Sequence, residues 1–256
     1  MKIGFFDSGI GGLTVLHQAL RFLPNEDYIF YADSLHVPYG EKPKDEVREY
    51  ILNAVEFIAN QDVKAVVLAC NTATSIVVEE LRQKYNFPIL GMEPAVKPAV
   101  IKWKGQRKKV LVLATTLTLR EKKYHDLVNR IDQDEIVDNL PLPGLVHFAE
   151  NFEFNEEKVI PYLKEELSHF DLKKYGTVVL GCTHFPYFEN TMKKIFPDGV
   201  EFISGSIGTV KNLRNILEKT NQVNDGSGNI EFFISGNKVD DKDTLANYRR
   251  LLSMQN

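Results

Sequence analysis

The chain has 256 residues, of which 43% are hydrophobic and 26% are charged, with 31 Lys and Arg residues against 35 Asp and Glu residues. These proportions are typical of a globular protein with one large domain or two smaller ones. The longest apolar stretches, such as 65–70 and 110–114, are far shorter than the roughly 20 residues of a membrane-spanning helix, which excludes that class. The formal net charge of -4 gives no electrostatic footprint for nucleic acid.

The N-terminal residues and the cysteine content indicate the cellular compartment that we expect for the protein. MKIGFF carries one Lys and lacks the apolar region and cleavage site of a signal peptide, so we expect a cytoplasmic protein. Its two cysteines, Cys70 and Cys182, are too few for a disulfide scaffold in a chain of this size. Each is therefore either a buried apolar residue or a group with a chemical role.

Short apolar runs recur along the chain and predict strands that are buried on both faces. Amphipathic segments separate them, and in one of these Val47, Ile51, Val55 and Ile58 share a helical face. This alternation predicts an α/β fold of parallel sheets flanked by helices, with ligand sites at the carboxyl ends of the strands. The predicted strands cover residues 2–6, 28–32, 65–69, 88–90, 110–114, 177–181, 201–203 and 230–235.

Turn and loop segments divide the predicted strands and helices into groups. Glu93-Pro94 and residues 204–206 are candidate hinges, and the polar stretch 224–229 predicts a surface loop before a late strand. The hinges predict two lobes, composed of residues 1–94 with 208–256 and of residues 95–207.

Two segments of the chain end in the same way. Residues 66–72 and 178–183 are each an apolar strand that finishes in a cysteine with a threonine just beyond it. Cys70 lies in the first predicted lobe and Cys182 in the second, about one domain length apart. The recurrence predicts two pseudo-symmetric lobes, each presenting one thiol at a strand end, with an active site between the lobes.

A glycine-rich turn, DSGIGG at 7–12, follows the first predicted strand and opens a helix. Glycines permit close backbone approach, and amides at a helix N-terminus can hold a carboxylate. The G-x-G-G spacing differs from the G-x-G-x-x-G dinucleotide fingerprint, so a nucleotide site is not indicated. Asp7 sits at the strand end, where it is either an N-cap or a catalytic auxiliary.

The segment 33–40, DSLHVPYG, follows the second predicted strand. Pro38 and Gly40 flank Tyr39 and predict a stiff loop. Two interpretations stay open for this loop. It is either only a rigid connection, or it binds a small polar ligand through the Tyr39 hydroxyl and its backbone donors.

Polar residues follow both cysteines directly. The amide and hydroxyl groups of Asn71, Thr72 and Thr183 are suited to binding a carboxylate or an ammonium group. A histidine such as His184, two residues after Cys182, can shift a thiol toward its thiolate. The sequence has no C-x-x-C or H-x-x-x-H pair, so we expect no metal site.

Two thiols that face each other from two lobes have three possible chemical roles. Redox pairs usually take the adjacent form C-x-x-C, and a Cys-His nucleophile needs no second matching cysteine. An opposed acid and base pair fits the symmetry best, because one thiolate removes a proton while the other thiol donates one. Donation on the opposite face inverts a stereocentre, which predicts racemisation or epimerisation at a carbon acid.

At these residues the sequence resembles the glutamate racemases, cofactor-independent enzymes that supply D-glutamate for bacterial peptidoglycan. Aspartate racemases share the two-cysteine plan, but the D-S-G-x-G-G turn favours glutamate. The resemblance covers nearly the whole chain and runs in order through 7–12, 33–34 with 38–40, 70–73, 93–94 and 181–186.

The resemblance implies a role for each site residue. Cys70 would remove the α-proton of D-glutamate and Cys182 that of L-glutamate, each thiol reprotonating in the opposite direction. Asp7 would assist Cys70, and His184 with Glu150 would assist Cys182. The substrate-binding residues that it implies are Ser8, Tyr39, Gly40, Asn71, Thr72, Thr118 and Thr183.

The resemblance also implies partners. We expect glutamate as the small-molecule substrate, no cofactor, no metal ion, no nucleic-acid or membrane partner, and a homodimer. Three alternatives stay open: a racemase of the same fold for aspartate or another amino acid, a non-catalytic amino-acid-binding module, and a redox protein. Turnover of the two acids, deuterium incorporation at the α-carbon and reversible thiol oxidation distinguish them.

Overall fold

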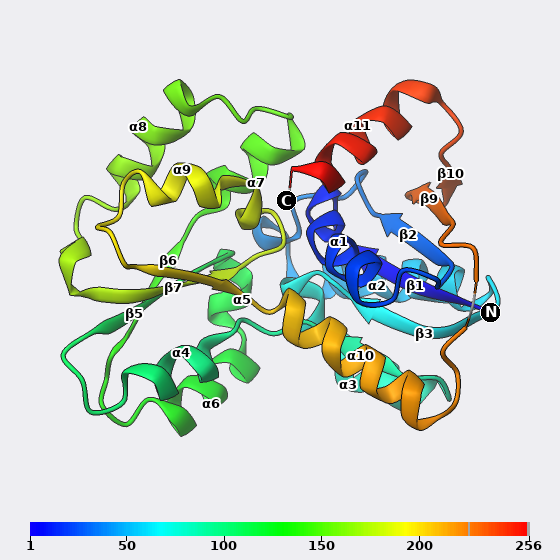
Figure 1. Cartoon of the computed structure of the whole chain (residues 1–256), viewed down its shortest axis with the longest axis horizontal. Helices are drawn as coiled ribbons and strands as arrows, with labels where there is room; N and C mark the ends of the chain where they lie inside the picture. Colours follow the sequence, from blue (N-terminus) through cyan, green and yellow to red (C-terminus); the bar gives the residue numbers. More distant parts are fainter. Residues whose placement is uncertain (225, 255–256) are drawn as a thin grey trace.

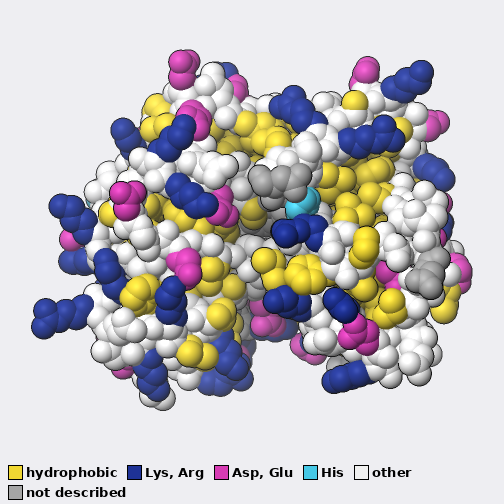
Figure 2. Space-filling model, viewed as in Figure 1, with side chains coloured by type: hydrophobic (Ala, Val, Ile, Leu, Met, Phe, Trp, Pro, Cys, Tyr) yellow, Lys and Arg dark blue, Asp and Glu magenta, His cyan; other side chains and the backbone are white. Residues whose placement is uncertain are grey.

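The computed structural model describes residues 1–224 and 226–254, which form two α/β lobes side by side (Figure 1). Position 225, inside the loop expected at 224–229, lies outside the described residues, as do positions 255 and 256 of the expected first lobe. Among the described residues, no helix is long and apolar enough to cross a membrane. Lys, Arg, Asp and Glu side chains are interspersed over the face in Figure 2.

The first lobe is built on a six-stranded sheet. Its strands are parallel except the short edge strand β10, which runs antiparallel to β9. Strands β2 and β3 are buried along their whole length, as their continuous apolar runs predict. In spatial order the strands are β10 (Asn237–Lys238), β9 (Ile230–Ile234), β2 (Tyr28–Ala32), β1 (Lys2–Asp7), β3 (Val63–Leu68) and β4 (Ile89–Gly91).

Helices cover both faces of this sheet (Figure 1). The predicted apolar face of α2 (Lys44–Ala59), formed by Val47, Ile51, Val55 and Ile58, is fully buried, which confirms that periodicity. One face of the sheet carries α1 (Leu13–Phe22), α10 (Ser206–Lys219) and α11 (Lys242–Ser253), and the other carries α2 (Lys44–Ala59) and α3 (Asn71–Lys84). Two short 3-10 turns, η1 (Ile10–Gly12) and η2 (Tyr39–Glu41), lie in the loops after β1 and β2.

The second lobe is built on a four-stranded parallel sheet, in the order β6 (Val137–Pro141), β5 (Lys109–Ala114), β7 (Tyr175–Gly181) and β8 (Glu201–Ser204). Successive residues of β5 and β7 face opposite sides, so each side of the sheet has its own apolar cluster. One side packs against α4 (Val96–Trp103) and α6 (Lys122–Ile131), and the other against α7 (Pro143–Glu150), α8 (Glu156–Glu166) and α9 (Glu189–Lys193). The remaining short elements are α5 (Thr116–Arg120), η3 (Leu172–Lys174) and η4 (Phe185–Phe188).

The predicted two-lobe α/β architecture is confirmed, and every predicted strand is present within two residues of its expected limits. Two strands were not predicted, β6 and β10. The sequence of β6, VDNLP, contains residue types that strands disfavour, and only Leu140 is buried, because the strand lies at the sheet edge. Such a strand has no continuous apolar segment from which it could be predicted.

The two candidate hinges lie between elements of the two sheets. Glu93-Pro94 lies between β4 of the first lobe and α4 of the second, and Gly205 lies between β8 and α10. Helix α10 begins at Ser206, two residues before the expected boundary at 208, and packs against α1. The crossings therefore fall at short irregular segments rather than within an element.

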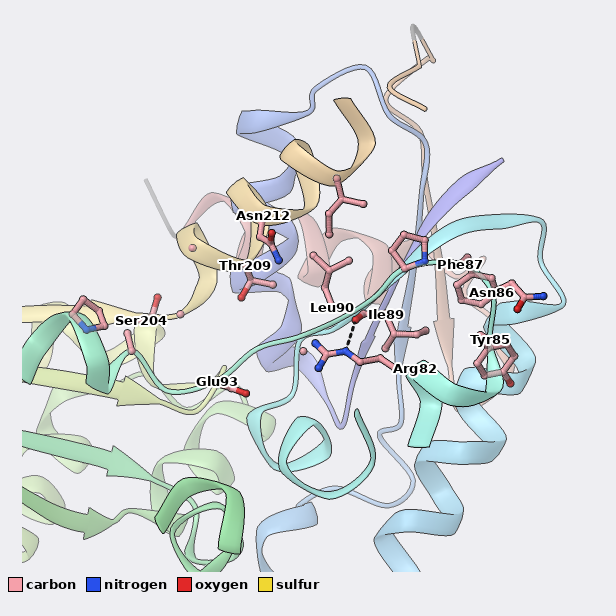
Figure 3. Close-up of a pocket in the computed structure, with 17 residues that line it drawn as sticks. Arg82, Tyr85, Asn86, Phe87, Ile89, Leu90, Glu93, Ser204, Thr209 and Asn212 are labelled. Carbon is pink, nitrogen blue, oxygen red and sulfur yellow. Dashed lines mark hydrogen bonds between the residues drawn. The ribbon is translucent and has the colours of Figure 1, made fainter. Parts of the chain in front are cut away.

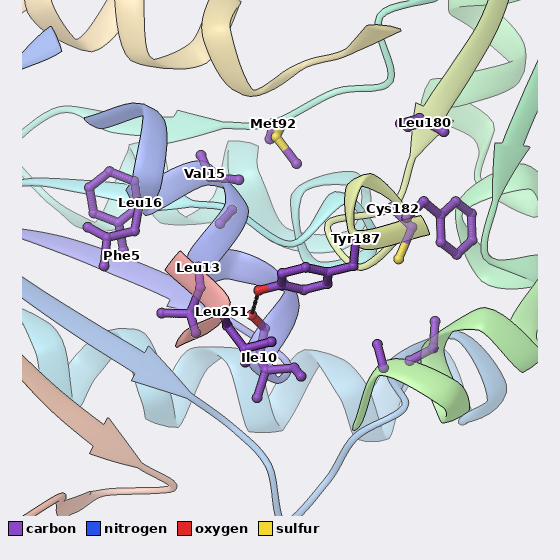
Figure 4. Close-up of a cluster of buried hydrophobic side chains, with 14 of the residues drawn as sticks. Phe5, Ile10, Leu13, Val15, Leu16, Met92, Leu180, Cys182, Tyr187 and Leu251 are labelled. Carbon is purple, nitrogen blue, oxygen red and sulfur yellow. Dashed lines mark hydrogen bonds between the residues drawn. The ribbon is translucent and has the colours of Figure 1, made fainter. Parts of the chain in front are cut away.

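The hydrophobic core continues from one lobe into the other (Figure 4). Tyr187, in η4 of the second lobe, lies beside Ile10 and donates a hydrogen bond from its hydroxyl to the Ile10 carbonyl oxygen at 3.0 Å. Leu13 and Leu16 of α1 belong to the same cluster as Leu180. The contact fixes the start of α1 next to the segment that carries Cys182.

Candidate active site

A small cavity of about 20 Å³ lies between the lobes, where the carboxyl ends of central strands of the two sheets face each other. Cys70, just after β3, and Cys182, just after β7, both line it. Most of the predicted site residues line this cavity: Ser8, Tyr39, Gly40, Cys70, Asn71, Thr72, Cys182, Thr183 and His184.

The three remaining predicted residues lie behind the lining. The carboxylate of Asp7 accepts a hydrogen bond from the Thr183 hydroxyl at 3.2 Å. The carboxylate of Glu150 lies 2.6 Å from Nε2 of His184. Thr118 is buried, and its hydroxyl lies 3.1 Å from that of Thr72. These three residues contact lining residues and do not themselves face the cavity.

Cys70 caps the N-terminus of α3. Its Sγ accepts a hydrogen bond from the Ala73 amide at 3.5 Å, and the thiol donates to the Ser8 hydroxyl at 3.7 Å. Burial, together with the nearby Asp7 carboxylate, raises the pKa of the Cys70 thiol to about 12, although the hydrogen bond from the Ala73 amide opposes this rise. Cys70 therefore rests as a neutral thiol, able to donate a proton.

Cys182 lies beside a histidine. Its Sγ is 3.5 Å from Nδ1 of His184, whose other ring nitrogen contacts Glu150. Burial on its own lowers the pKa of His184, but the hydrogen bonds to Cys182 and Glu150 outweigh it and hold that pKa well above its ordinary value. The imidazole is thus held as a cation between the sulfur of Cys182 and the carboxylate of Glu150. The two thiols therefore occupy chemically different surroundings.

Asp7 connects the two sides of the site. Its Oδ2 accepts the Gly9 amide at 3.2 Å, and its Oδ1 accepts the Thr183 hydroxyl from the other lobe. Burial outweighs the opposing positive charge of His184 and raises the pKa of Asp7 to about 6. A fully buried carboxyl group with such a pKa can exchange a proton near neutral pH.

The glycine-rich turn holds a carboxylate of the protein itself. The Ile10 amide, at the start of η1, donates a hydrogen bond to Glu150 Oε1 at 2.8 Å. A Cβ atom on Gly9 would lie 1.9 Å from the same oxygen, and one on Gly11 would lie 2.4 Å from the Thr183 hydroxyl oxygen. The glycines are needed here because the second lobe approaches the backbone closely.

Thr115 was not among the predicted site residues. It caps α5, lines the cavity, and places its hydroxyl 2.9 Å from that of Thr72, across the lobe boundary. The signal that could have found it is its place directly after strand β5, which matches the place of Asn71 and Thr183 near their own strand ends. The other lining residues missed from the sequence are Pro38, Glu41, Thr116, Pro143 and Val146.

A larger groove of about 830 Å³ lies on the hinge side of the molecule (Figure 3). Glu93 and Ser204 line it at the crossings between the lobes, and Arg82 lies at its floor with Nε donating to the Ile89 carbonyl at 3.2 Å. Neither cysteine lines this groove. Within the described ranges, no cluster of three or more His, Cys, Asp or Glu side chains could hold a metal ion. Both cysteines line the smaller cavity instead.

Comparison with known proteins identifies the family of the chain. Residues 13–212 match the Asp/Glu/hydantoin racemase family. The chain belongs to this family. The racemase is 61% identical over 254 residues to glutamate racemase 2 of Bacillus subtilis (strain 168), a match that covers 99% of this chain and 96% of that relative.

A second relative and a solved structure extend the comparison. The racemase is 55% identical over 254 residues to the glutamate racemase of Halothermothrix orenii, covering 98% of this chain and 99% of that one. The crystal structure of glutamate racemase from Francisella tularensis in complex with D-glutamate matches with a TM-score of 0.82 at 27% identity, covering 98% of this chain and 93% of that one. The protein is therefore an amino-acid racemase with the two-lobe fold.

Proposed function

We propose that this racemase interconverts L- and D-glutamate and that Cys70 and Cys182 are its two proton-transferring groups. The observation that carries the assignment of the thiols is their position: both line one cavity, each from a different lobe and each at the end of a central strand. The glutamate specificity is supported by the two relatives, both named glutamate racemases, which this chain matches over 96% and 99% of their length.

In this mechanism the α-carbon of glutamate lies between the two sulfur atoms. With L-glutamate, the Cys182 thiolate removes the α-proton and the Cys70 thiol donates its own proton to the opposite face, which gives D-glutamate. The reverse reaction begins with a Cys70 thiolate and a Cys182 thiol. The raised pKa of the Cys70 thiol supports its role as the proton donor in the first of these directions, and the cationic imidazole of His184 lies beside Cys182.

Positioning and electrostatic stabilisation must supply the acceleration, because the α-carbon is a very weak acid. Oδ1 of Asn71 is buried and has no hydrogen-bond partner among the described residues, so it suits the substrate ammonium group. The hydroxyl and amide groups of the assigned substrate-binding residues suit the two carboxylates. These residues are Ser8, Tyr39, Gly40, Asn71, Thr72 and Thr183, which line the cavity, and Thr118, whose hydroxyl lies behind that of Thr72 and acts through it.

Entry of glutamate requires the lobes to separate, because a cavity of about 20 Å³ holds roughly one water molecule. We assign the moving units to residues 1–94 with 208–256 and to residues 95–207. Ion pairs join the lobes in the closed form, among them Lys44 with Glu121 at 2.6 Å and Lys123 with Glu93 at 2.8 Å. Nε2 of His147 also lies 2.7 Å from the Glu41 carboxylate across the same boundary. Closure excludes water and strengthens the electrostatic interactions inside the site.

The wider role follows from the resemblance to glutamate racemases. We assign the enzyme to the supply of D-glutamate for peptidoglycan in the cytoplasm, acting as a homodimer and without a cofactor. Growth of a strain that lacks this chain, with and without added D-glutamate, tests the cellular part of the proposal, and analytical ultracentrifugation tests the dimer.

The decisive experiment is proton NMR of the purified protein with L-glutamate, and separately with D-glutamate, in deuterated water without added cofactor. We expect the wild type to invert both enantiomers with deuterium entering the α-carbon, and Cys70→Ala and Cys182→Ala each to lose inversion. A wild type that leaves glutamate unlabelled but labels aspartate overturns the substrate assignment. Binding of glutamate without any labelling would show a binding module instead.

A further inference from the structure

We infer that Asp33, which sits behind the cavity wall, is a positioning residue that holds the substrate-binding loop 34–41 through the hydroxyl of Tyr39. This role concerns how the enzyme binds its substrate, and it rests on the proposed glutamate racemase activity. Asp33 directly follows β2, and its backbone N–H donates to the Asp7 carbonyl at 3.0 Å. Its backbone is thereby fixed beside the end of β1, next to the site.

Three side chains converge on the Asp33 carboxylate. The Tyr39 hydroxyl donates to Oδ2 at 2.5 Å, the Ser235 hydroxyl donates to Oδ1 at 3.0 Å, and Nδ1 of His36 lies 2.9 Å from both oxygens. Asp33 is only 3% exposed, and burying a carboxylate is costly unless it is well hydrogen-bonded. This cluster therefore forms a rigid support for the loop.

The support acts on the cavity wall through Tyr39 and Gly40. Tyr39 is 1% exposed and lines the cavity, while its hydroxyl bonds to Asp33 behind the wall. Gly40 packs so closely against the second lobe that a Cβ atom there would lie 2.6 Å from Cβ of Thr115. A small shift of the loop would therefore change both the width of the cavity and its contact with Thr115.

An independent observation comes from the turn between β9 and β10. Ser235 has a φ of 45°, in the left-handed region that residues other than glycine rarely adopt. Its hydroxyl donates to Asp33 and accepts the Leu35 amide at 3.1 Å. A serine at this strained position thus contributes two hydrogen bonds to the loop, which a glycine there would lose.

An aromatic stack packs against the outer side of loop 34–41. The ring of His36 stacks on that of Tyr50, with 3.7 Å between the ring centroids, and Tyr50 belongs to α2. Backbone hydrogen bonds hold the two ends, since His36 N–H donates to the Asp33 carbonyl and Lys42 N–H to the Tyr39 carbonyl. Between these ends the side chains around Asp33 hold the loop.

Asp33→Asn tests this role, with Asp138→Asn as the matched control. Asp138 also accepts a hydrogen bond from a tyrosine, Tyr175, at 2.6 Å, but it lies on β6 and does not contribute to the cavity wall. We measure kcat and KM for both enantiomers, and hydrogen exchange of residues 34–41. We expect Asp33→Asn to raise both KM values by roughly tenfold, with kcat changed less than about threefold, and to accelerate exchange in the loop. The control leaves these quantities unchanged.

A double variant shows whether Asp33 acts through Tyr39. We expect Tyr39→Phe to raise KM, and addition of Asp33→Asn to change it less than about twofold further, because both remove the same hydrogen bond. Fully additive effects, or an Asp33→Asn enzyme with unchanged KM, overturn the proposed role. If Asp33→Asn fails to fold, Ser235→Ala takes its place, with a smaller rise in KM expected and an unchanged KM counting against the role.

Failure of the proposed function gives a different result. A wild type that does not racemise glutamate overturns the activity, and hydrogen exchange then decides the role of Asp33 by itself. Faster exchange of residues 34–41 in Asp33→Asn, with none in Asp138→Asn, supports the role. Equal exchange in the wild type and Asp33→Asn overturns it.

Discussion

Glu150, at the end of α7 in the second lobe, accepts a hydrogen bond from the backbone N–H of Ile10 in the first lobe at 2.8 Å. The same oxygen, Oε1, lies 2.6 Å from Nε2 of His184. One oxygen therefore joins the glycine-rich turn to the imidazole beside Cys182. The contact between the lobes and the orientation of the histidine depend on the same atom.

Substitution of Glu150 by Gln should lower kcat/KM by about 100-fold, because His184 loses the anion that supports its positive charge. The two directions must fall equally, since L- and D-glutamate have the same free energy and the ratio of their kcat/KM values is fixed. Polarimetry from each enantiomer measures both. Glu156→Gln, which alters an exposed ion pair with Lys194, is the control and should leave the rates unchanged. A loss below about threefold in Glu150→Gln would contradict the assigned role.

Gly11→Ala should lower kcat/KM by about 100-fold while the protein stays folded. The added Cβ would lie 2.4 Å from the Thr183 hydroxyl oxygen and 2.6 Å from Nδ1 of His184, so these groups must move. Gly208→Ala in α10 is the control: no atom lies near its Cβ, and alanine favours the helix by about 0.5–1 kcal/mol. Thermal unfolding and activity assays of both variants check this. Equal activity of the two variants would show that the close approach at Gly11 is not required.

Asp7→Asn should become more stable relative to the wild type as the pH rises. The pKa of Asp7 is raised from 3.8 to about 6, so the folded state binds more protons than the unfolded state between these values. The protonated Asp7 carboxyl group contributes its full share to the free energy of unfolding of the wild type below the unfolded-state pKa of 3.8. This contribution is lost as the pH rises through the folded-state pKa of about 6. The variant, which has no such proton, should gain on the order of 3 kcal/mol relative to the wild type between about pH 4 and about pH 7. Urea unfolding of both proteins measures this, and a pH-independent difference would be incompatible with it.

Lys44→Ala should weaken closure and raise KM by up to about fivefold, because the ion pair with Glu121 joins the lobes but Lys44 is half exposed. Lys102→Ala is the matched control, since its ion pair with Glu201 at 2.8 Å lies within the second lobe. Small-angle scattering with and without D-glutamate measures closure directly. A radius of gyration that does not change on adding D-glutamate would count against lobe motion.

Much of the fold was predictable because each central strand corresponds to a continuous apolar segment of the sequence. Strands buried on both faces need continuous hydrophobic segments, and β2 and β3 have them. Edge strand β6 could not be found in this way, because only Leu140 of its residues is buried. The pairing of Glu150 with Ile10 could not be found either, since 140 residues separate the two and no local pattern records such a contact.

The sequence by itself determined the two-lobe α/β architecture, the place of each thiol at the end of a strand, and the resemblance to glutamate racemases. These features depend on short-range patterns of apolar residues, glycines and cysteines. Only the tertiary structure decided that Asp7 and Glu150 lie behind the cavity, that Thr115 faces it, and that Asp33 supports Tyr39. The physical reason is that these contacts form between side chains of different strands, helices and loops, which meet only when those elements pack together, and most of the paired residues are distant in the chain.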